Sequence, residues 1–192
     1  MAVYNAIMHR RTIRQFRQKP IPKSILRRLI NAARLAPSAA NLQPLEFMVI
    51  TDKDICAKIF PHLRWAGYIH PAGTPPPDKI PVAYIVVLVN KNKARPRYAA
   101  YDVGAAVQNI LLAAWENGIG SCWMQSIERG RIKEILGIFR DSRIDSIISL
   151  GYLAEKPVVE EFRGSVKYWK DKMGILHVPK RNINQILYKD IL

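Results

Sequence analysis

The 192-residue sequence has few cysteines, no long hydrophobic run and little acid near its start. Its two cysteines, Cys56 and Cys122, lie in apolar segments and are too few for a disulfide framework, so we expect two buried free thiols. The longest apolar run, 82–89, has eight residues, whereas a membrane helix needs about 20. The first residues also lack the apolar stretch of about 7–15 residues that a signal peptide requires. We therefore expect a single domain, residues 1–192, in the cytoplasm, with no membrane span.

Motifs that bring their own catalytic chemistry are absent as well. Gly118 and Gly120 begin a glycine pattern, but Trp123 stands where the dinucleotide-binding fingerprint needs its third glycine. The sequence contains no GxxxxGK[ST], HExxH or GxSxG motif and no cysteine pair at zinc spacing. The four histidines lie far apart in the sequence: His9, His62, His70 and His177. We expect no metal site, and an enzyme with this sequence would take its chemistry from a cofactor.

What the sequence has in excess is positive charge, concentrated near the start. Thirty Lys and Arg against fifteen Asp and Glu give +15, and the pI is near 10.1. Residues 1–45 hold nine basic residues and no acid, so they supply +9 of the +15. This balance favours an anionic partner, such as nucleic acid, an acidic membrane surface or a phosphorylated ligand. Because the chain has no RNA-binding aromatic motif or helix-turn-helix, a nucleic-acid-binding module is only an alternative interpretation.

Helical and strand-like segments interleave, but not in strict βαβ order. Apolar periodicity and β-branched runs predict helices over 22–36, 98–117, 128–136 and 183–188, and strands over 45–51, 82–90, 121–125 and 144–151. About four strands, the first after two helices, favour an α+β sheet flanked by helices over a doubly wound fold. The helix over 98–117 is apolar on nearly every side, which predicts burial all round, at a subunit interface.

Two segments depart from this pattern. Residues 61–81 contain six prolines and two glycines, and we expect a loop long enough to act as a lid or a binding loop. Residues 162–192 form a basic and aromatic C-terminal extension.

Three constellations carry candidate chemistry. Arg10, Arg11 and Arg14 lie within five residues, beside Thr12, and could surround a phosphate, although a solvated basic face fits equally. Residues 36–44, APSAANLQP, combine two fixed turns, small residues and amide groups, which suits a flat ligand or an ordinary loop. Residues 118–125, GIGSCWMQ, form a glycine-flanked turn that can present backbone N–H groups or simply enter the core.

Together and in this order, four segments give the chain a specific resemblance. They are RRTIRQF, APSAANLQPLEF, YDVGAAVQNILLAAWENGIGSCWM and IISLGYLAEKP. The chain resembles short members of the nitroreductase family of flavoproteins, over essentially its whole length. The resemblance implies a mixed β-sheet flanked by helices and an intertwined homodimer with two FMN sites at the interface. It also implies hydride transfer from NADH or NADPH to the flavin and on to a small electron-poor acceptor, such as a nitroaromatic or a quinone.

The resemblance also implies roles for individual residues. At the phosphate and ribityl end it places these residues: Arg10, Arg11, Thr12, Arg14, Lys180 and Arg181. At the isoalloxazine ring it places these residues, the first four from the partner subunit: Pro37, Ser38, Ala39, Asn41, Met124 and Gln125. The backbone N–H of Gln125 would point at flavin N5, which makes it the one catalytic candidate, because a nearby N–H tunes hydride acceptance.

The sequence departs from larger family members at residues 61–81, which replace a longer helical region there. Tyr68, His70 and the prolines at 75–77 are expected to cover the flavin instead. This leaves three other interpretations open: reductive dehalogenation, flavin destruction to build a cobalamin ligand, and flavin binding without NAD(P)H turnover.

Overall fold

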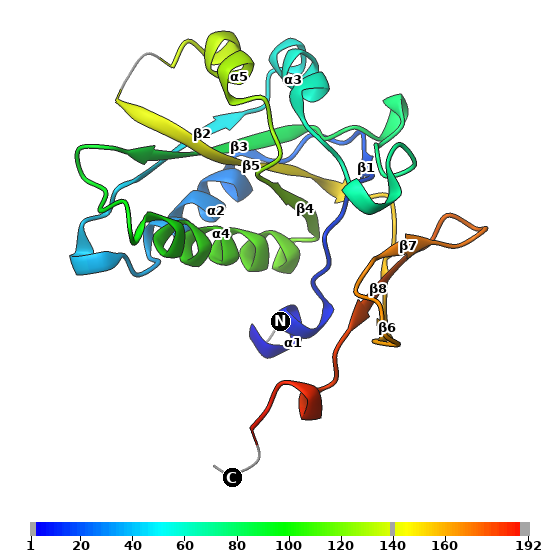
Figure 1. Ribbon diagram of the computed structural model, residues 1–192. Coiled ribbons are helices and arrows are strands. Elements are labelled where there is room, and N and C mark those ends of the chain that lie inside the picture. Colours follow the sequence, from blue (N-terminus) through cyan, green and yellow to red (C-terminus); the bar gives the residue numbers. More distant parts are fainter. Residues whose placement is uncertain (1–2, 139–140, 189–192) are drawn as a thin grey trace.

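The computed structural model describes residues 3–138 and 141–188, and it places a β-sheet between two layers of helices (Figure 1). The helices of the described residues are α1 (Val3–His9), α2 (Lys23–Arg34), α3 (Lys53–Ile59), α4 (Ala99–Glu116) and α5 (Arg129–Leu136). The strands of the described residues are β1 (Phe16–Arg17), β2 (Leu45–Ile50), β3 (Ala83–Asn90), β4 (Ile119–Met124), β5 (Ser142–Leu153), β6 (Val158–Glu161), β7 (Trp169–Lys170) and β8 (Leu176–Lys180).

The long strand β5 organises the main sheet. Strand β3 pairs with one side of β5 and β4 with the other, and β2 pairs with the far side of β3. The short β1 pairs with the end of β5, at Tyr152 and Leu153. These strand pairs are all antiparallel, and the α+β class predicted from the sequence is confirmed. Parallel pairing occurs in two other places among the described residues: the single bridge between Thr12 and Ser121, and the pair of β6 with β8.

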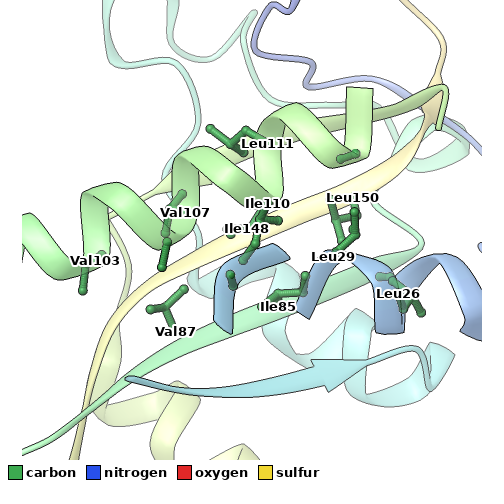
Figure 2. Close-up of a cluster of buried hydrophobic side chains, with 14 of the residues drawn as sticks. Leu26, Leu29, Ile85, Val87, Val103, Val107, Ile110, Leu111, Ile148 and Leu150 are labelled. Carbon is green, nitrogen blue, oxygen red and sulfur yellow. The ribbon is translucent and has the colours of Figure 1, made fainter. Parts of the chain in front are cut away.

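One face of the sheet packs against α2 and α4 (Figure 2). Alternate residues of β3, among them Ile85 and Val87, point to this face and meet Leu29 of α2 and Ile110 of α4. This alternation follows from the period of two of a β-strand. All residues of β3 except its last are buried, which confirms the prediction of a strand covered on both faces.

The opposite face packs against α3 and α5. Tyr84 and Val86 of β3 point to this side, and Cys56 and Cys122 are buried there as free thiols, as expected from the sequence. Helix α3 begins where Asp52 accepts a hydrogen bond from the Ile55 N–H at 2.9 Å, a typical N-cap.

The C-terminal part differs most from the sequence prediction. Residues after 157, expected to be a tail with one short helix, form a second sheet in which β8 lies between β6 and β7. A short 3₁₀ turn, Ile183–Gln185, stands where a helix was predicted. These strands have only two to five residues, too few for a periodic sequence signal.

The proline-rich segment 61–81 is a loop, as predicted, and it meets the C-terminal sheet. It contains short 3₁₀ turns rather than a long helix. The Tyr68 and Tyr168 rings lie 5.0 Å apart, and the Lys170 ammonium donates to the Ala72 carbonyl at 2.9 Å. The loop and the C-terminal extension therefore form one structural unit at that end of the molecule.

Among residues 3–138 and 141–188, no helix is long and apolar enough to cross a membrane.

Candidate functional site

The arginine segment 10–14 is held against the start of β4. Thr12 forms a bridge with Ser121, and the Ile13 N–H donates to the Ser121 carbonyl at 2.9 Å. Gly120 makes this close approach possible, because a Cβ there would lie 2.8 Å from the Ile13 Cβ. Gly120 and the bridge to Ser121 therefore set the position of the backbone that carries the Arg10, Arg11 and Arg14 side chains.

Both ends of the chain contribute to one cavity of about 360 Å³ beside this segment. Its polar and aromatic lining is Arg10, Arg11, Thr12, Arg14, Tyr168 and Lys180. The structure therefore brings Lys180 together with Arg10, Arg11, Thr12 and Arg14, although Lys180 lies 166 positions after Arg14 in the sequence. Arg181 is exposed just after β8 and does not line the cavity.

The lining of the cavity has four cationic side chains, Arg10, Arg11, Arg14 and Lys180, and no acidic one among the described residues. Burial, and secondly the charge of Arg11, lower the pKa of Arg10, which shows that the two guanidinium groups oppose each other. The Nε of Arg14 is buried without a hydrogen-bond partner, and its guanidinium lies 5.2 Å from the centre of the Tyr168 ring. Fork-shaped donors around an open volume suit a phosphate dianion, which would compensate the charge of the guanidinium groups.

Glu155 anchors the arginine segment, and the sequence analysis did not single it out. Its Oε1 accepts hydrogen bonds from the backbone N–H of Arg14 and, at 3.2 Å, of Gln15. The residue lies in YLAEKP, a segment noted only for its resemblance. The contact joins residues 140 positions apart, so spacing could not have revealed it.

The second constellation, residues 36–44, forms a tight loop at the start of α4. Ser38 Oγ accepts from the Gln43 N–H at 3.0 Å, and the Ala39 N–H donates to Asp102 Oδ1 at 2.8 Å. Asp102 is buried on α4 and is a second anchor that the sequence analysis did not assign. Ala40, Asn41 and Gln43 have positive φ angles of 50°, 54° and 48°. A positive φ at three residues that are not glycine strains the backbone of this loop. Such strain is concentrated at functional sites in proteins.

Within one chain, the loop 36–44 and the arginine cavity do not meet. The loop contacts the first turn of α4, and the arginine segment pairs with β4, just after α4 ends. Fourteen helical residues, 103–116, follow Asp102 before α4 ends, a rise of about 21 Å along the helix at 1.5 Å per residue. Figure 1 shows the loop, in light blue, at one end of α4, away from α1.

The third constellation divides at the end of β4. The Met124 side chain is 6% exposed and belongs to the core beside α3 and α5. Gln125 follows the strand and is exposed, and its carbonyl accepts from the Arg129 guanidinium at 3.0 Å. Four extended residues join Ser121 to Gln125, about 13 Å at 3.3 Å per residue. The described residues contain no group of three or more His, Cys, Asp or Glu side chains that could hold a metal ion.

Several known proteins are similar to this chain in sequence and in fold. The sequence matches the Nitroreductase family profile over residues 7–152. A protein of Methanothermobacter thermautotrophicus, provisionally named NADH dehydrogenase/NAD(P)H nitroreductase, is 33% identical over 162 residues, 82% of this chain and 80% of the relative. An FMN-dependent nitroreductase from Clostridium difficile is 29% identical with a TM-score of 0.66, over 79% of this chain and 88% of the other. A structure from Desulfovibrio desulfuricans, solved in complex with FMN, is 26% identical with a TM-score of 0.69, over 85% and 93%. The chain belongs to the nitroreductase family.

Proposed function

We propose that the protein is an FMN-dependent oxidoreductase that takes hydride from NADH or NADPH and reduces a small electron-poor acceptor. The observation that carries this proposal is the cavity of three arginines and Lys180 at one end of β4, with Gln125 at the other. Ser121, which holds the arginine segment, and Gln125 are roughly 13 Å apart along extended chain, which suits an elongated cofactor with an anionic end and a flat redox ring. The names of two relatives, an FMN-dependent nitroreductase and an NADH dehydrogenase/NAD(P)H nitroreductase, support the same chemistry.

At the anionic end, Arg10, Arg11 and Arg14 would hold the phosphate and the ribityl chain. Thr12 would add a hydroxyl donor, and Lys180 would close the cavity from the C-terminal extension. Arg181, exposed next to Lys180, would reach the same phosphate from its outer side. Bidentate guanidinium groups match phosphate oxygens better than isolated ammonium groups do.

At the ring end, the site would need a second copy of the chain. Because about 21 Å of α4 separates loop 36–44 from the arginine segment of its own chain, the partner subunit's Pro37, the partner subunit's Ser38 and the partner subunit's Ala39 would meet the ring. The partner subunit's Asn41 would lie beside it. Exposed apolar residues support such a homodimer: Val3, Tyr4, Ile7 and Met8 on α1, and Ile183, Ile186, Leu187 and Tyr188 near the C-terminus.

Bound FMN would supply the redox chemistry, because its ring accepts a hydride and passes electrons to a second substrate. The chain's own residues would orient and shield it. The Gln125 backbone N–H would stand near flavin N5, while Met124 supports that backbone from the core. Tyr68, Tyr168 and the proline-rich loop would exclude water. No side-chain acid or base is required, which agrees with the absence of hydrolase and zinc motifs.

A flavin spectrum tests the proposal. The purified chain, or the chain reconstituted with FMN, should be yellow, and anaerobic NADH or NADPH should bleach it. Arg14→Gln should weaken FMN binding by about tenfold or more, because the loss of one charge-assisted hydrogen bond costs about 1.4 kcal/mol of binding free energy. Arg28→Gln on the exposed face of α2 is the matched control and should change nothing.

Three results would contradict the proposal. Protein that stays colourless after incubation with FMN would exclude the cofactor. Protein that binds FMN but is not reduced by either nicotinamide would identify a flavin-binding protein without turnover. Binding of an oligonucleotide that FMN does not compete for, with a steep salt dependence, would favour the nucleic-acid alternative.

A further inference from the structure

A basic turn between β3 and α4 has no part in the site described above. Residues 91–97, KNKARPR, contain four cations and no acid. Asp141 contacts the start of this turn, where its carbonyl accepts from the Lys91 N–H at 3.1 Å and its Oδ2 from the Asn92 amide at 3.4 Å. At the other end, no carboxylate of the described residues forms an ion pair with Arg97. Arg97 is therefore an exposed guanidinium with no carboxylate partner among the described residues, at the place where the turn enters α4.

Arg97 lines an open cavity of about 520 Å³ together with two tyrosines. Tyr98, the N-cap residue of α4, and Tyr101, in the first turn of the helix, are three residues apart and have 38% and 73% exposure. The Arg97 guanidinium is 5.7 Å from the centre of the Tyr98 ring. No described residue forms a hydrogen bond with either phenol hydroxyl, so both can donate to a ligand.

The other wall of this cavity is the strained loop, through Pro37, Ser38 and Ala39. Asp102, the acidic residue of the lining, accepts the Ala39 N–H at 2.8 Å, which fixes the loop against the helix. The lining therefore holds one charge of each sign, the buried Asp102 carboxylate against the wall and the exposed Arg97 guanidinium at the mouth. Two tyrosines and one arginine therefore line the same volume as the strained loop.

We propose that this cavity binds a small aromatic molecule that carries an anionic group, and that Arg97 selects for the charge. The ring would pack on Tyr98 and Tyr101, and the anionic oxygens would accept from Arg97. This inference rests on the proposed function, because the loop 37–39 that walls the cavity would also contact the partner's flavin. An anionic aromatic acceptor held here would lie beside the redox ring.

A binding experiment separates this inference from turnover. Calorimetry on the full-length FMN-loaded chain would compare 4-aminobenzoate with 4-aminobenzyl alcohol, which has a similar ring but no charge. We expect the carboxylate to bind about tenfold more tightly, the ratio that one charge-assisted contact of about 1.4 kcal/mol produces. Arg97→Gln should remove this preference. Arg95→Gln, which removes the same charge from the same turn but not from the cavity lining, should preserve it.

Kinetics then place the site in the reaction. Arg97→Gln should raise the KM for 4-nitrobenzoate about tenfold and leave that for 4-nitrobenzyl alcohol, the FMN content and the rate of reduction by NADH unchanged. Equal effects of the two arginine variants, equal affinity for both probes, or slower reduction by NADH in Arg97→Gln would each overturn the proposal. If the chain retains no FMN, the proposed function fails, but the same calorimetry on that chain still shows whether Arg97 selects the carboxylate.

Discussion

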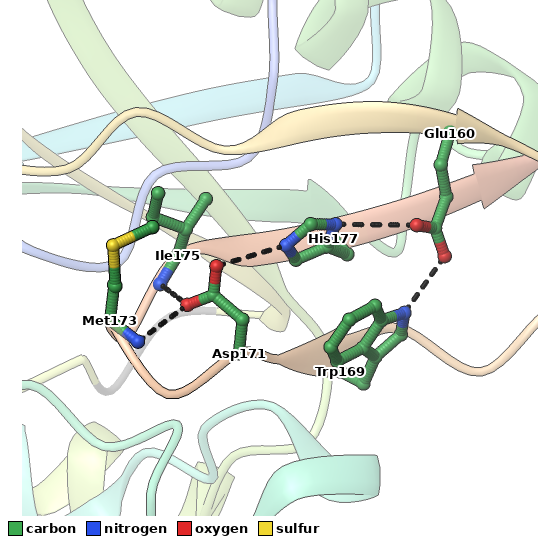
Figure 3. A network of polar contacts seen from close by, with 6 residues as sticks. All are labelled: Glu160, Trp169, Asp171, Met173, Ile175 and His177. Carbon is green, nitrogen blue, oxygen red and sulfur yellow. Dashed lines mark hydrogen bonds and ion pairs between the residues drawn. The ribbon is translucent and has the colours of Figure 1, made fainter.

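The indole ring of Trp169 stacks on the imidazole of His177, with ring centres 4.2 Å apart and planes inclined by 14° (Figure 3). Glu160 joins the two rings, because its carboxylate contacts both the Trp169 Nε1 at 2.8 Å and the His177 Nδ1 at 3.2 Å. On the other side of the imidazole, Asp171 lies 3.3 Å from Nε2. This network ties β6, β7 and β8 into the sheet that presents Tyr168 and Lys180 to the arginine cavity.

The first prediction concerns acid, because Asp171 holds the turn between β7 and β8. Burial raises the pKa of Asp171, but hydrogen bonds from the Ile175 N–H, His177 and the Met173 N–H outweigh this and lower the pKa below its ordinary 3.8. A lowered folded-state pKa contributes stability above pH 3.8 that is lost as the pH falls through the folded value. We expect the small sheet to open below about pH 4, which hydrogen exchange or the change in tryptophan fluorescence would detect. Asp171→Asn should lack this acid step, and identical acid profiles for both proteins would contradict the assignment.

The second prediction concerns Glu155, which accepts two backbone N–H groups of the arginine segment. Glu155→Ala should weaken FMN binding by about tenfold, because the segment that carries Arg14 loses both anchors. The sign is informative, since removing a carboxylate near an anion site would on charge alone tighten binding. Glu161→Ala, an exposed residue of β6, is the control for net charge, and FMN affinity measured by flavin fluorescence distinguishes the two effects. Tighter FMN binding in Glu155→Ala would show that charge, not position, dominates.

The sequence predicted the long elements well, for a physical reason. The apolar β3 and the eighteen-residue α4 have enough residues to express their period, and both lie where predicted, within one or two residues. Burial of α4 on every side does not follow from one chain, because Tyr101 and Gln108 are exposed on its outer face. Short strands such as β1 and β7 depend on contacts made elsewhere, so local pattern could not reveal them.

The sequence predicted individual residues of the candidate site, but not how the fold brings them together. Arg10, Arg11 and Arg14 stand in one motif, and Lys180 is implied only by resemblance; the structure adds that they share a cavity. The anchors Glu155 and Asp102 act through backbone N–H groups distant in sequence, which no spacing encodes. Met124, the last residue of β4, points into the core, whereas Gln125 follows the strand and is exposed.

The third prediction concerns the strained loop. Ala40 has φ 50° and ψ 26°, a left-handed conformation that costs a β-carbon residue about 1–2 kcal/mol. Ala40→Gly should therefore leave the free energy of unfolding nearly unchanged, because relief of this strain offsets the roughly 0.4–1 kcal/mol of added unfolded-chain entropy. Ala40→Val should lower it by about 1–2 kcal/mol, since a branched side chain tolerates this region poorly. Denaturant unfolding measures both, with the same pair at exposed Ala72, whose φ is not positive, as the control. Equal losses at the two positions would show that the loop is not strained.

The fourth prediction concerns Gly151, which lets β1 lie close to β5. A Cβ at this position would stand 2.7 Å from the Phe16 Cβ, and Phe16 is fully buried, so neither group can give way cheaply. Gly151→Ala should lower the free energy of unfolding by about 1–3 kcal/mol, the usual range for overpacking. Because Phe16 follows Arg14 by two residues, the same change should weaken FMN binding. Gly130→Ala is the matched control: nothing lies within 4 Å of a Cβ there, and alanine favours helix α5 by up to about 1 kcal/mol. A Gly151→Ala protein that unfolds like the wild type would mean that β1 moves freely, and the arginine cavity would then lack the rigid base that its FMN site requires.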